Sequence, residues 1–503
     1  MCTATQRLMQ EHSAQLFING QYQTASSARH NIINPATEQV IGSYADASEA
    51  EMEQAISASS VAQKAWWALS SLERAEALHL VADKLAAMSA TVGECLTREM
   101  GKPYREAEWE AGASGSSFRY YAELARQDQG RVSGPAIAGQ LQMTIKEPLG
   151  TVVSIVPYNF PVLLFGWQAA ASLAAGNAII VKPSEMTSLT LLLLMPAFDH
   201  LPDGLVQVIT GGAEAGRFLV AHQHTHAVAF TGSVPAGQAV AQSAALRFKP
   251  ALIEASGNDP FIVMPSAPVE VVARGAAFAA FLNCGQVCTS AERFYVHEAV
   301  YERFVSALAV EARRLRIGSG LECVDIGPMA SQRERERVER IVARAIEQGA
   351  KIVCGGQRPT GLEKGWYYQP TVLEVSHSMD IMHGECFGPL APVCKVRDLD
   401  EAIALANDSD FGLGANIYTE NLSEAMRAVN EIESGIVWVN TPLNDNDCVP
   451  FGGRKMTGMG RELGSEGLEQ FRRSKMVMIA PKAEADPEWF PYPDNEAFSA
   501  VGR

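Results

Sequence analysis

Apolar residues recur at every third or fourth position between residues 48 and 100, and this spacing predicts two or three amphipathic helices. Gly101 and Pro103 follow directly and predict the end of the last of these helices. The positions that make up the predicted apolar faces are Val61, Ala65, Leu69, Leu78, Val81, Leu85 and Met88.

Between residues 151 and 256 the pattern changes to short β-branched runs separated by helical segments. Because the runs are apolar on both faces, they predict strands covered by helices on both sides, in a mostly parallel, doubly wound sheet. Such sheets bind dinucleotides at the carboxyl ends of their strands. The predicted strands are 152–156, 178–181, 206–209, 227–230 and 251–253.

A second α/β unit is predicted after the first, from about residue 257 to 470. Two further strand-like segments fit neither unit, and they could pair with each other or with another subunit, so we expect a homodimer or a homotetramer. These segments are the alternating Leu141, Met143 and Ile145, and the run 476–479. The second unit has predicted helices at 269–281 and 332–347, and predicted strands at 261–263, 294–296, 372–375 and 436–439.

The predicted domain organisation follows from these patterns. The end of the chain is aromatic, with Trp489, Phe490 and Tyr492 among prolines, and its competing interpretation is a loosely ordered terminus. The predicted parts are a nucleotide-binding domain (1–125 and 147–256), a catalytic domain (257–470), oligomerisation strands (126–146 and 471–490) and a C-terminal tail (491–503).

The composition argues against several classes of protein. With 41 basic and 57 acidic residues among 503, the net charge is −16, and 47% of the residues are hydrophobic, which argues against disorder. No block of like charge favours nucleic acid or an anionic membrane as a partner, so a small-molecule substrate is expected. Residues 1–15 lack the apolar core of a secretory signal, and no apolar segment is long enough to span a bilayer. Nine cysteines without C-x-x-C spacing predict neither a disulfide framework nor a zinc site, which fits a cytoplasmic location.

Three residues could carry covalent acyl chemistry. Cys288 lies in a predicted loop, and Glu254 ends a predicted strand. A thiolate nucleophile and a carboxylate base are what acyl transfer followed by hydrolysis needs. Asn159, between two prolines, could donate its amide to a developing oxyanion. Each of these residues also has a purely structural interpretation. For Cys288 this is the role of a small packing residue, which most cysteines have.

Two further segments could bind a nucleotide. Lys182 and Glu185 lie three residues apart at a predicted strand end and could bracket the hydroxyls of a ribose. Gly232 and Ser233 lie where a strand meets a helix start, whose free amides and dipole favour a pyrophosphate. No G-x-G-x-x-G motif is present, so spacing alone leaves this interpretation weak.

Taken together, these segments resemble the aldehyde dehydrogenase superfamily in order and spacing, from about Phe17 to Arg473. The resemblance implies an α/β fold with a Rossmann-like, doubly wound NAD-binding domain, an α/β catalytic domain and a small β oligomerisation arm. It also implies NAD-dependent oxidation of an aldehyde to the carboxylic acid. The motifs that carry the resemblance are 157–161, 181–185, 230–233, Glu254, 285–288, Glu385 with 387–389, 450–453 and 460–462.

The resemblance further implies a role for each motif. Cys288 attacks the aldehyde carbon, Asn159 and the Cys288 amide hold the oxyanion, and Glu254 activates the water that hydrolyses the thioester. Relatives that pass the acyl group to coenzyme A lack this base. The Glu185 carboxylate would accept a bond from a ribose 2′-hydroxyl but repel a 2′-phosphate, so NAD is expected, with NADP as the alternative. The residues expected around the cofactor are Pro157, Tyr158, Lys182, Glu185, Gly232, Ser233, Glu385 and Phe387.

Three positions depart from the family pattern. Ser256 stands where a glycine is usual after the base, which could restrict Glu254 and slow hydrolysis. Tyr158 stands where most members of the family have a tryptophan, directly before the asparagine that holds the oxyanion. Cys284 lies four residues before Cys288, where a packing role is favoured over a reversible disulfide.

The predicted substrate pocket is apolar and aromatic, which favours a neutral aliphatic or aromatic aldehyde. Asp445 and Asp447, in a loop near the expected entrance, favour an aminoaldehyde or betaine aldehyde as the alternative. A semialdehyde is less favoured. Relatives that resemble succinate-semialdehyde dehydrogenases clamp the distal carboxylate of the substrate with two arginines, and Trp167 and Leu282 stand at those positions here. A non-catalytic relative is least favoured. The predicted wall is Tyr158, Leu163, Leu164, Trp167, Val287, Thr289 and Phe451.

Three alternating histidines are a further candidate for metal chemistry. His222, His224 and His226 could share one face of a strand as metal ligands do. A polar connection before the next strand is the favoured interpretation, and no metal is expected.

Overall fold

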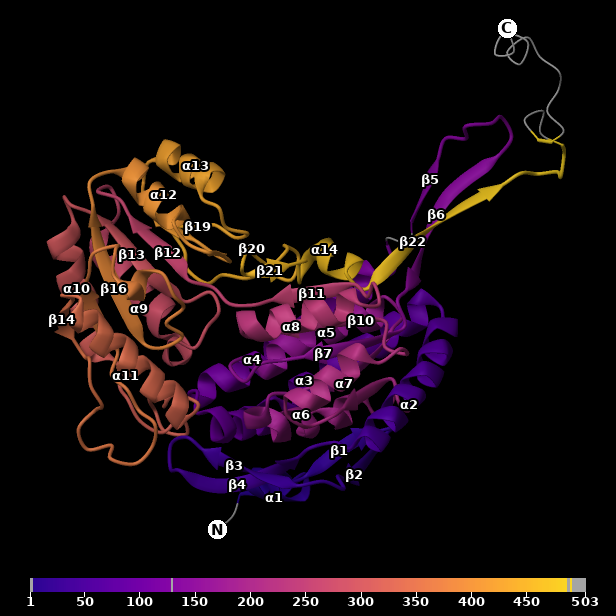
Figure 1. Cartoon of the computed structure of the whole chain (residues 1–503), viewed down its shortest axis with the longest axis horizontal. Helices are drawn as coiled ribbons and strands as arrows, with labels where there is room; N and C mark the ends of the chain where they lie inside the picture. The colour runs from indigo at the N-terminus through magenta and orange to yellow at the C-terminus, as the bar shows by residue number, and fades with distance from the viewer. Residues whose placement is uncertain (1–2, 128–129, 486–488, 491–503) are drawn as a thin grey trace, which may run out of the picture. The chain divides into compact units, whose positions relative to one another are not determined.

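The structure, a computed structural model, describes residues 3–127, 130–485, 489 and 490 (Figure 1). The chain divides into two units, and the larger contains two main sheets with their helices, whereas the smaller contains one sheet. The larger unit consists of Met1–Gln127 and Pro148–Arg472, and the smaller of Asp128–Glu147 and Arg473–Arg503.

The first sheet of the larger unit has eight strands in the order β2-β1-β9-β8-β7-β10-β11-β21. Its five central strands are parallel, and each coincides with one of the predicted β-branched runs. The outer strands pair antiparallel. The bounds are β1 (Gln15–Ile18), β2 (Gln21–Thr24), β7 (Thr151–Ile155), β8 (Ala178–Lys182), β9 (Val206–Val208), β10 (Ala227–Thr231), β11 (Ala251–Glu254) and β21 (Gly458–Met459).

Helices cover both faces of this sheet, as predicted. Val152 and Val153 follow each other in β7, yet they belong to different hydrophobic cores, and Ile179 and Ile180 in β8 do the same. Among the described residues, no helix combines the length and apolarity needed to cross a membrane. The helices of this half are α1 (Ala4–Glu11), α2 (Glu49–Ala68), α3 (Ser71–Met100), α4 (Tyr104–Leu124), α5 (Pro161–Ala174), η1 (Glu185–Thr187), α6 (Ser188–Leu193), η2 (Met195–Phe198), α7 (Ala213–Ala221) and α8 (Val234–Ala245).

Helix α2 corrects one prediction from the sequence. The spacing correctly indicated a helix, but Val61 on the expected apolar face is 71% exposed. The helix instead buries a stripe that includes Met52, Ile56 and Trp66, and the Trp66 indole donates to the Leu173 carbonyl at 2.8 Å. The bulky, hydrogen-bonded Trp66 therefore decides which face of α2 is buried, because the many small residues of this helix are compatible with burial of either face.

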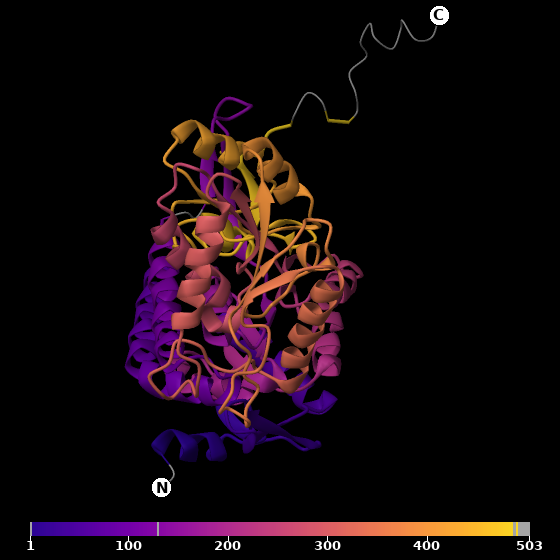
Figure 2. The same ribbon diagram turned by 90° about the vertical axis from the view of Figure 1, so that its left-hand side faces the viewer.

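The second sheet has the order β14-β15-β16-β13-β12-β18-β19, and all its strands except β14 are parallel. Helices lie on both sides of its strands (Figure 2). Its strands are β12 (Asp259–Val263), β13 (Ala291–His297), β14 (Lys351–Cys354), β15 (Thr371–Glu374), β16 (Leu390–Val396), β18 (Asn416–Tyr418) and β19 (Trp438–Val439). The helices of this part of the chain are α9 (Val269–Phe281), η3 (Leu282–Gly285), α10 (Tyr301–Arg314), α11 (Gln332–Glu347), η4 (Asp380–Met382), α12 (Leu399–Asn407), α13 (Leu422–Glu431) and α14 (Gly464–Glu469).

Several strands were not predicted from the sequence. β16 is buried between β15 and β13 although it contains Pro392, a residue that argues against an interior strand because it cannot donate to the ladder. β14 and β18 are short and lack a distinct pattern. Two-stranded pairs also form, between β3 (Arg29–Asn34) and β4 (Gln39–Ala45), and between β17 (Phe411–Gly412) and β20 (Arg454–Lys455).

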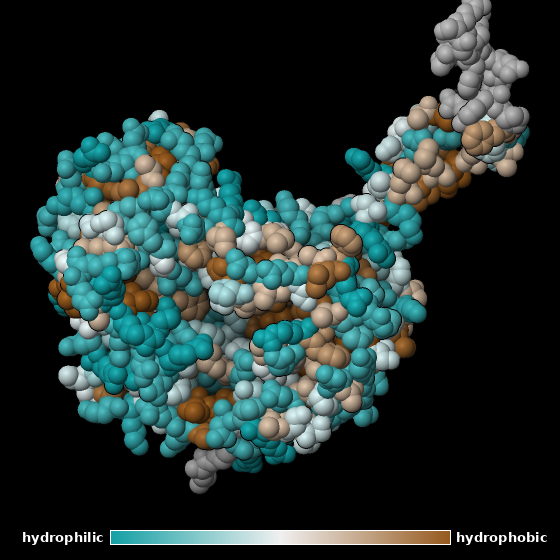
Figure 3. Space-filling model, in the orientation of Figure 1, coloured by the Kyte–Doolittle hydropathy of each residue, from teal (hydrophilic) through white to brown (hydrophobic). Residues whose placement is uncertain are grey.

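The smaller unit is a three-stranded sheet in the order β22-β6-β5. β6 (Leu141–Pro148) and β22 (Arg472–Ile479) are neighbours, so the two strand-like segments pair with each other. β5 (Gly130–Ser133) was not predicted. Figure 3 shows hydrophobic surface along these strands, and the predicted tail 491–503, with Tyr492, lies outside the described residues. The exposed apolar side chains are Val132, Leu141, Met476, Met478 and Ile479.

Candidate active site

Four neighbouring parallel strands, β8, β7, β10 and β11, end at the same edge of the first sheet. The register pairs Ile155 with Lys182 and Thr231 with Glu254, so these strand ends lie level with one another. Asn159 follows β7 by four residues. The sheet thus brings together residues that lie far apart in the sequence, as expected for a doubly wound fold.

The loop that carries Cys288 contacts this edge closely. The Asn159 side-chain amide donates to the Gln286 carbonyl at 3.1 Å. A Cβ at Gly257, three residues after the predicted base, would lie 2.1 Å from the Cys288 carbonyl oxygen, so only glycine fits there. Gly285 has φ +71°, and its Cβ would meet the Gly388 carbonyl at 2.1 Å. The structure therefore brings Cys288, Asn159 and the Glu254 loop together.

A buried ion pair holds the backbone at Asn159 in place. Lys102 Nζ contacts Glu110 Oε2 at 2.5 Å and donates to the Asn159 carbonyl at 2.6 Å, and neither side chain of the pair is exposed. Glu110 also accepts the backbone N–H groups of Val162 and Leu163 at the start of α5, at 2.8 and 3.2 Å. This pair therefore fixes the backbone at Asn159 and at the start of α5, directly after it.

Removing one partner of this pair leaves the other charge buried without compensation. We expect Lys102→Met to lower the free energy of unfolding by about 3–5 kcal/mol, measured by denaturant unfolding. Lys395→Met is the matched control, because Lys395 pairs with Glu302 at the surface and should cost about 1 kcal/mol or less. Equal losses in both variants would contradict a supporting role for Lys102.

Buried carboxylates surround the candidate nucleophile. Burial and the neighbouring Glu462 and Glu385 raise the pKa of Glu254 to about 8. Burial and Glu254 raise the pKa of the Cys288 thiol above its usual range. At neutral pH the thiol therefore keeps its proton, and Glu254 titrates close to the pH at which a general base works best.

A chain of buried hydrogen bonds connects β7, β10 and the C-terminal part of the unit near Glu254. The Gln168 amide donates to Glu462 at 2.9 Å and to the Thr231 hydroxyl at 3.2 Å, and the Ser154 hydroxyl donates to Gln168 at 2.6 Å. Burial raises the pKa of Glu462 to about 7. Neither Gln168 nor the role of Glu462 was predicted from the sequence, because the two residues are 294 positions apart.

The segment with Glu385 and Phe387 is held by another buried carboxylate. Glu292 accepts the backbone N–H groups of Cys386 and Phe387 at 2.7 and 2.6 Å, and Arg337 donates to the Phe387 carbonyl at 3.1 Å. The Tyr158 and Phe387 rings meet edge to face at 6.1 Å. Two predicted cofactor residues from distant parts of the sequence therefore contact each other.

Glu385 lies beside the backbone that follows the candidate base, Glu254. Its carboxylate accepts from the Gly257 N–H at 3.3 Å, and burial with the neighbouring Glu292 raises its pKa to about 8 against hydrogen bonds from Ser256 and Gly257. Ser256 has φ +111°, a conformation that costs energy for any residue with a side chain. The restriction of Glu254 by Ser256 stays a prediction, and this strain supports it.

The residues expected to hold a dinucleotide fit that group in their own geometry. Lys182 is buried and its Nζ makes one described hydrogen bond, to the Pro183 carbonyl at 3.1 Å, which leaves donors for hydroxyls. A Cβ at Gly212, the N-cap of α7, would lie 3.6 Å from Glu185 Oε1, so a glycine keeps the space beside Glu185 open. Ser233 is the N-cap of α8 and its hydroxyl makes no capping hydrogen bond, so it can face an anion. The Gly232 N–H, in contrast, already donates to the Glu254 carbonyl at 3.0 Å.

The predicted substrate wall divides between a cavity and the core. Leu163 and Trp167 line a cavity of about 250 Å³. Tyr158, Leu164, Val287 and Phe451 belong to or pack against the same hydrophobic core without lining this cavity, and Thr289 is buried. The complete cavity lining is Trp109, Ala113, Ser116, Leu163, Trp167, Asp445, Asn446, Asp447 and Leu463.

The other candidates have separate partners. His222 pairs with Glu53 at 2.9 Å, whereas His226 Nδ1 accepts the Thr151 N–H at 3.0 Å, so these two alternating histidines contact different groups. The Cys284 thiol is buried against the Met329 sulfur at 3.6 Å, which supports the packing interpretation.

Comparisons with known proteins agree with this arrangement. The profile of the aldehyde dehydrogenase family matches residues 22–477. The chain is 36% identical over 483 residues to aminoaldehyde dehydrogenase 2, peroxisomal, of Malus domestica, and the match covers 92% of this chain and 95% of that relative. The solved 3,6-anhydro-L-galactose dehydrogenase in complex with NAP is 36% identical, with a TM-score of 0.90 over 92% of this chain and 99% of that one. Betaine aldehyde dehydrogenase of Staphylococcus aureus in complex with NAD+ is 29% identical, with a TM-score of 0.93 over 96% and 98% of the two chains.

These matches extend over nearly the whole chain and agree with the predicted fold class. The predicted activity, the oxidation of an aldehyde with a nicotinamide cofactor, is the activity of the matching family. Both predictions are therefore confirmed, and the chain belongs to the aldehyde dehydrogenase family.

Proposed function

We propose that this enzyme oxidises aldehydes with a cationic tail, such as aminoaldehydes and betaine aldehyde. The observation that carries the proposal is the cavity in which Asp445 and Asp447 stand together with Trp109 and Trp167. Tryptophan faces attract ammonium groups by about 0.5–2 kcal/mol, depending on desolvation, and carboxylates add charge attraction.

Asp445 is the carboxylate that is available to a ligand. Asp447 accepts from the Ser117 hydroxyl at 2.7 Å, whereas within the described part of the chain no basic side chain pairs with Asp445. Asp445 is reachable by solvent, yet the surrounding protein raises its pKa to about 6, so the carboxylate is mostly charged at neutral pH. It also contributes to the raised pKa of Cys288, which supports a position near the candidate nucleophile.

The competing substrates differ in the charge of the tail. A neutral aldehyde, which the sequence alone favoured, stays the competing prediction, because Leu163 and Leu463 give the same cavity an apolar part. A semialdehyde would bring its own carboxylate toward Asp445 and Asp447, and this repulsion argues against that class. Relatives named as aminoaldehyde and betaine aldehyde dehydrogenases support the cationic class.

The side chains of the site supply each step of the reaction. The Cys288 sulfur adds to the carbonyl carbon as its thiol proton passes to solvent, and the Asn159 amide with the Cys288 N–H holds the oxyanion of the thiohemiacetal. The bound cofactor supplies the acceptor for the hydride that leaves this carbon. Glu254 then takes a proton from water, the hydroxide attacks the thioester, and the carboxylic acid departs as the Cys288 sulfur receives this proton from Glu254.

We infer NAD as the preferred cofactor. The support is the open space between Gly212 and Glu185, in which the carboxylate would accept a ribose hydroxyl and repel a 2′-phosphate. One solved relative is in complex with NAP and another in complex with NAD+, so NADP remains the alternative.

The charge of Asp445 provides the test of the substrate class. For Asp445→Asn we expect kcat/KM for 4-aminobutanal and betaine aldehyde to fall about tenfold or more, and kcat/KM for hexanal to stay within about twofold of wild type. Asp410→Asn, which removes an exposed carboxylate outside this cavity, is the matched control for net charge. A wild-type preference for hexanal would assign the cavity to neutral aldehydes, and an equal loss for hexanal in Asp445→Asn would show that Asp445 does not recognise the cationic tail.

Location and assembly stay predictions. Relatives are named as peroxisomal and chloroplastic, so the expected cytoplasmic location has a direct competitor. The homodimer or homotetramer expected from the strand-like segments is supported by the exposed apolar side chains of β5, β6 and β22. No nucleic acid or membrane partner is proposed.

A further inference from the structure

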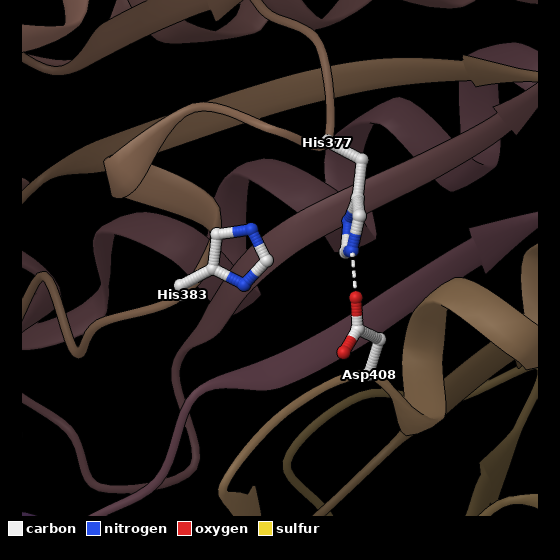
Figure 4. A group of neighbouring side chains, drawn as sticks. All are labelled: His377, His383 and Asp408. Atoms are coloured by element: carbon white, nitrogen blue, oxygen red, sulfur yellow. Dashed lines mark hydrogen bonds and ion pairs between the residues drawn. The ribbon is translucent and has the colours of Figure 1, made fainter.

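Two histidines and an aspartate come together in the larger unit, outside the groups used above (Figure 4). His377 lies in the loop after β15, His383 is the C-cap of η4, and Asp408 is the C-cap of α12. One nitrogen of each imidazole and one carboxylate oxygen of Asp408 all lie within 4.8 Å of one another. Figure 4 shows the three side chains, which come from three separate segments, directed toward a common space.

The hydrogen bonds of His377 orient its ring for a ligand role. Its Nε2 lies 2.9 Å from Asp408, and its Nδ1 lies 3.0 Å from the Tyr295 hydroxyl. That hydroxyl donates to the Leu405 carbonyl at 3.2 Å, so it accepts from Nδ1–H. Such an outer hydrogen bond is typical of imidazoles that bind metals. The Nε2 atom and the Asp408 carboxylate already face each other, so a metal that binds between them meets two oriented ligand atoms.

The other two side chains have room to complete the coordination. The Asp408 side chain is 68% exposed, and the His383 and His377 rings meet edge to face at 4.9 Å. In a tetrahedral zinc site, bonds of about 2.0–2.2 Å place ligand atoms roughly 3.5 Å apart. Rotation of the exposed side chains of His383 and Asp408 closes the difference from the observed separation, and solvent can supply a fourth ligand.

We propose that His377, His383 and Asp408 bind one zinc ion, with water as the fourth ligand. Two imidazoles and one carboxylate suit zinc, whereas magnesium and calcium take oxygen ligands. The ion joins three segments that are separate in the sequence. Because His383 precedes Glu385 by two residues, the bound ion also holds the chain that leads to Glu385.

The test uses the full-length enzyme, freed of metal by dialysis against a chelator and titrated with zinc chloride alone. We expect one zinc ion per chain in wild type, and affinities at least about tenfold weaker in His383→Ala and in Asp408→Asn. Zinc should also raise the Tm of wild type, and at the same zinc concentration it should raise the Tm of both variants by less, because ligand binding to the folded state stabilises it by an amount that increases with affinity. His224→Ala, which removes another surface histidine beside a second histidine, is the matched control and should bind zinc as wild type does.

Zinc held by cysteine thiols would give a different result. Such binding would be unaffected by His383→Ala and Asp408→Asn, and that outcome would overturn the proposal, as would the absence of zinc binding by wild type. If either variant fails to fold, cobalt bound to wild type decides the question. A tetrahedral cobalt spectrum without a thiolate charge-transfer band supports nitrogen and oxygen ligands, and a thiolate band contradicts them.

Discussion

Replacing Cys288 by alanine is expected to abolish aldehyde oxidation, with a loss in kcat of about 10⁴-fold or more, because the proposed thiohemiacetal and thioester both form on its sulfur. Ester hydrolysis, which needs the same acyl intermediate, should be lost in parallel. Cofactor binding should persist, since Lys182 and Ser233 lie on other segments of the chain. Absorbance of the reduced cofactor reports the oxidation, and a fluorescence titration with NAD reports the binding.

Cys284→Ala is the matched control for this result. Cys284 is buried against Met329 and has a left-handed backbone, but its thiol contacts this methionine rather than the strand edge that carries Asn159. The control should therefore keep the kcat of wild type with a small loss of stability. Oxidation that survives in Cys288→Ala would rule out the covalent mechanism.

Replacing Glu254 by glutamine separates the two halves of the reaction. Formation of the thioester does not need a base for water, so a burst of about one reduced cofactor per site should remain. Hydrolysis should then be slow, and the steady-state rate should fall by about 10²–10⁴-fold. Stopped-flow absorbance measures both phases in one experiment, and an unchanged steady-state rate would remove Glu254 from the role of base.

The pH dependence gives an independent check on Glu254. Burial and neighbouring carboxylates raise its pKa to about 8, and only the deprotonated form accepts a proton from water. The steady-state rate of wild type should therefore rise as the pH increases through this value, by about tenfold per unit well below it. This rise of the rate with pH should be absent in Glu254→Gln. A wild-type rate that stays constant as the pH passes through the pKa of Glu254 would contradict its assignment as the base.

The five parallel strands of the first sheet could be predicted to within about one residue because their pattern is local, whereas the antiparallel strands β1, β2 and β21 were not predicted. Val152 and Val153, or Ile179 and Ile180, are both apolar because each faces a different helical layer, and such runs are typical of parallel strands. The same reasoning fails for β16, where Pro392 breaks the local rule. It also fails for the face of α2, where Trp66 rather than the spacing decides which side is buried.

The sequence by itself determined the α/β class and the order of the parallel strands of the first sheet along the chain, because these patterns depend on neighbours within a few positions. It also led to the prediction of Cys288, Glu254 and Asn159, through motifs that together resemble one family. Only the tertiary structure decided which residues, far apart in the sequence, contact each other in and around this site. Lys102 reaches Asn159 across 57 positions, and Gln168 reaches Glu462 across 294. Packing at such separations leaves no periodic signal in the sequence, and the same packing removes water from Glu254 and so sets its pKa.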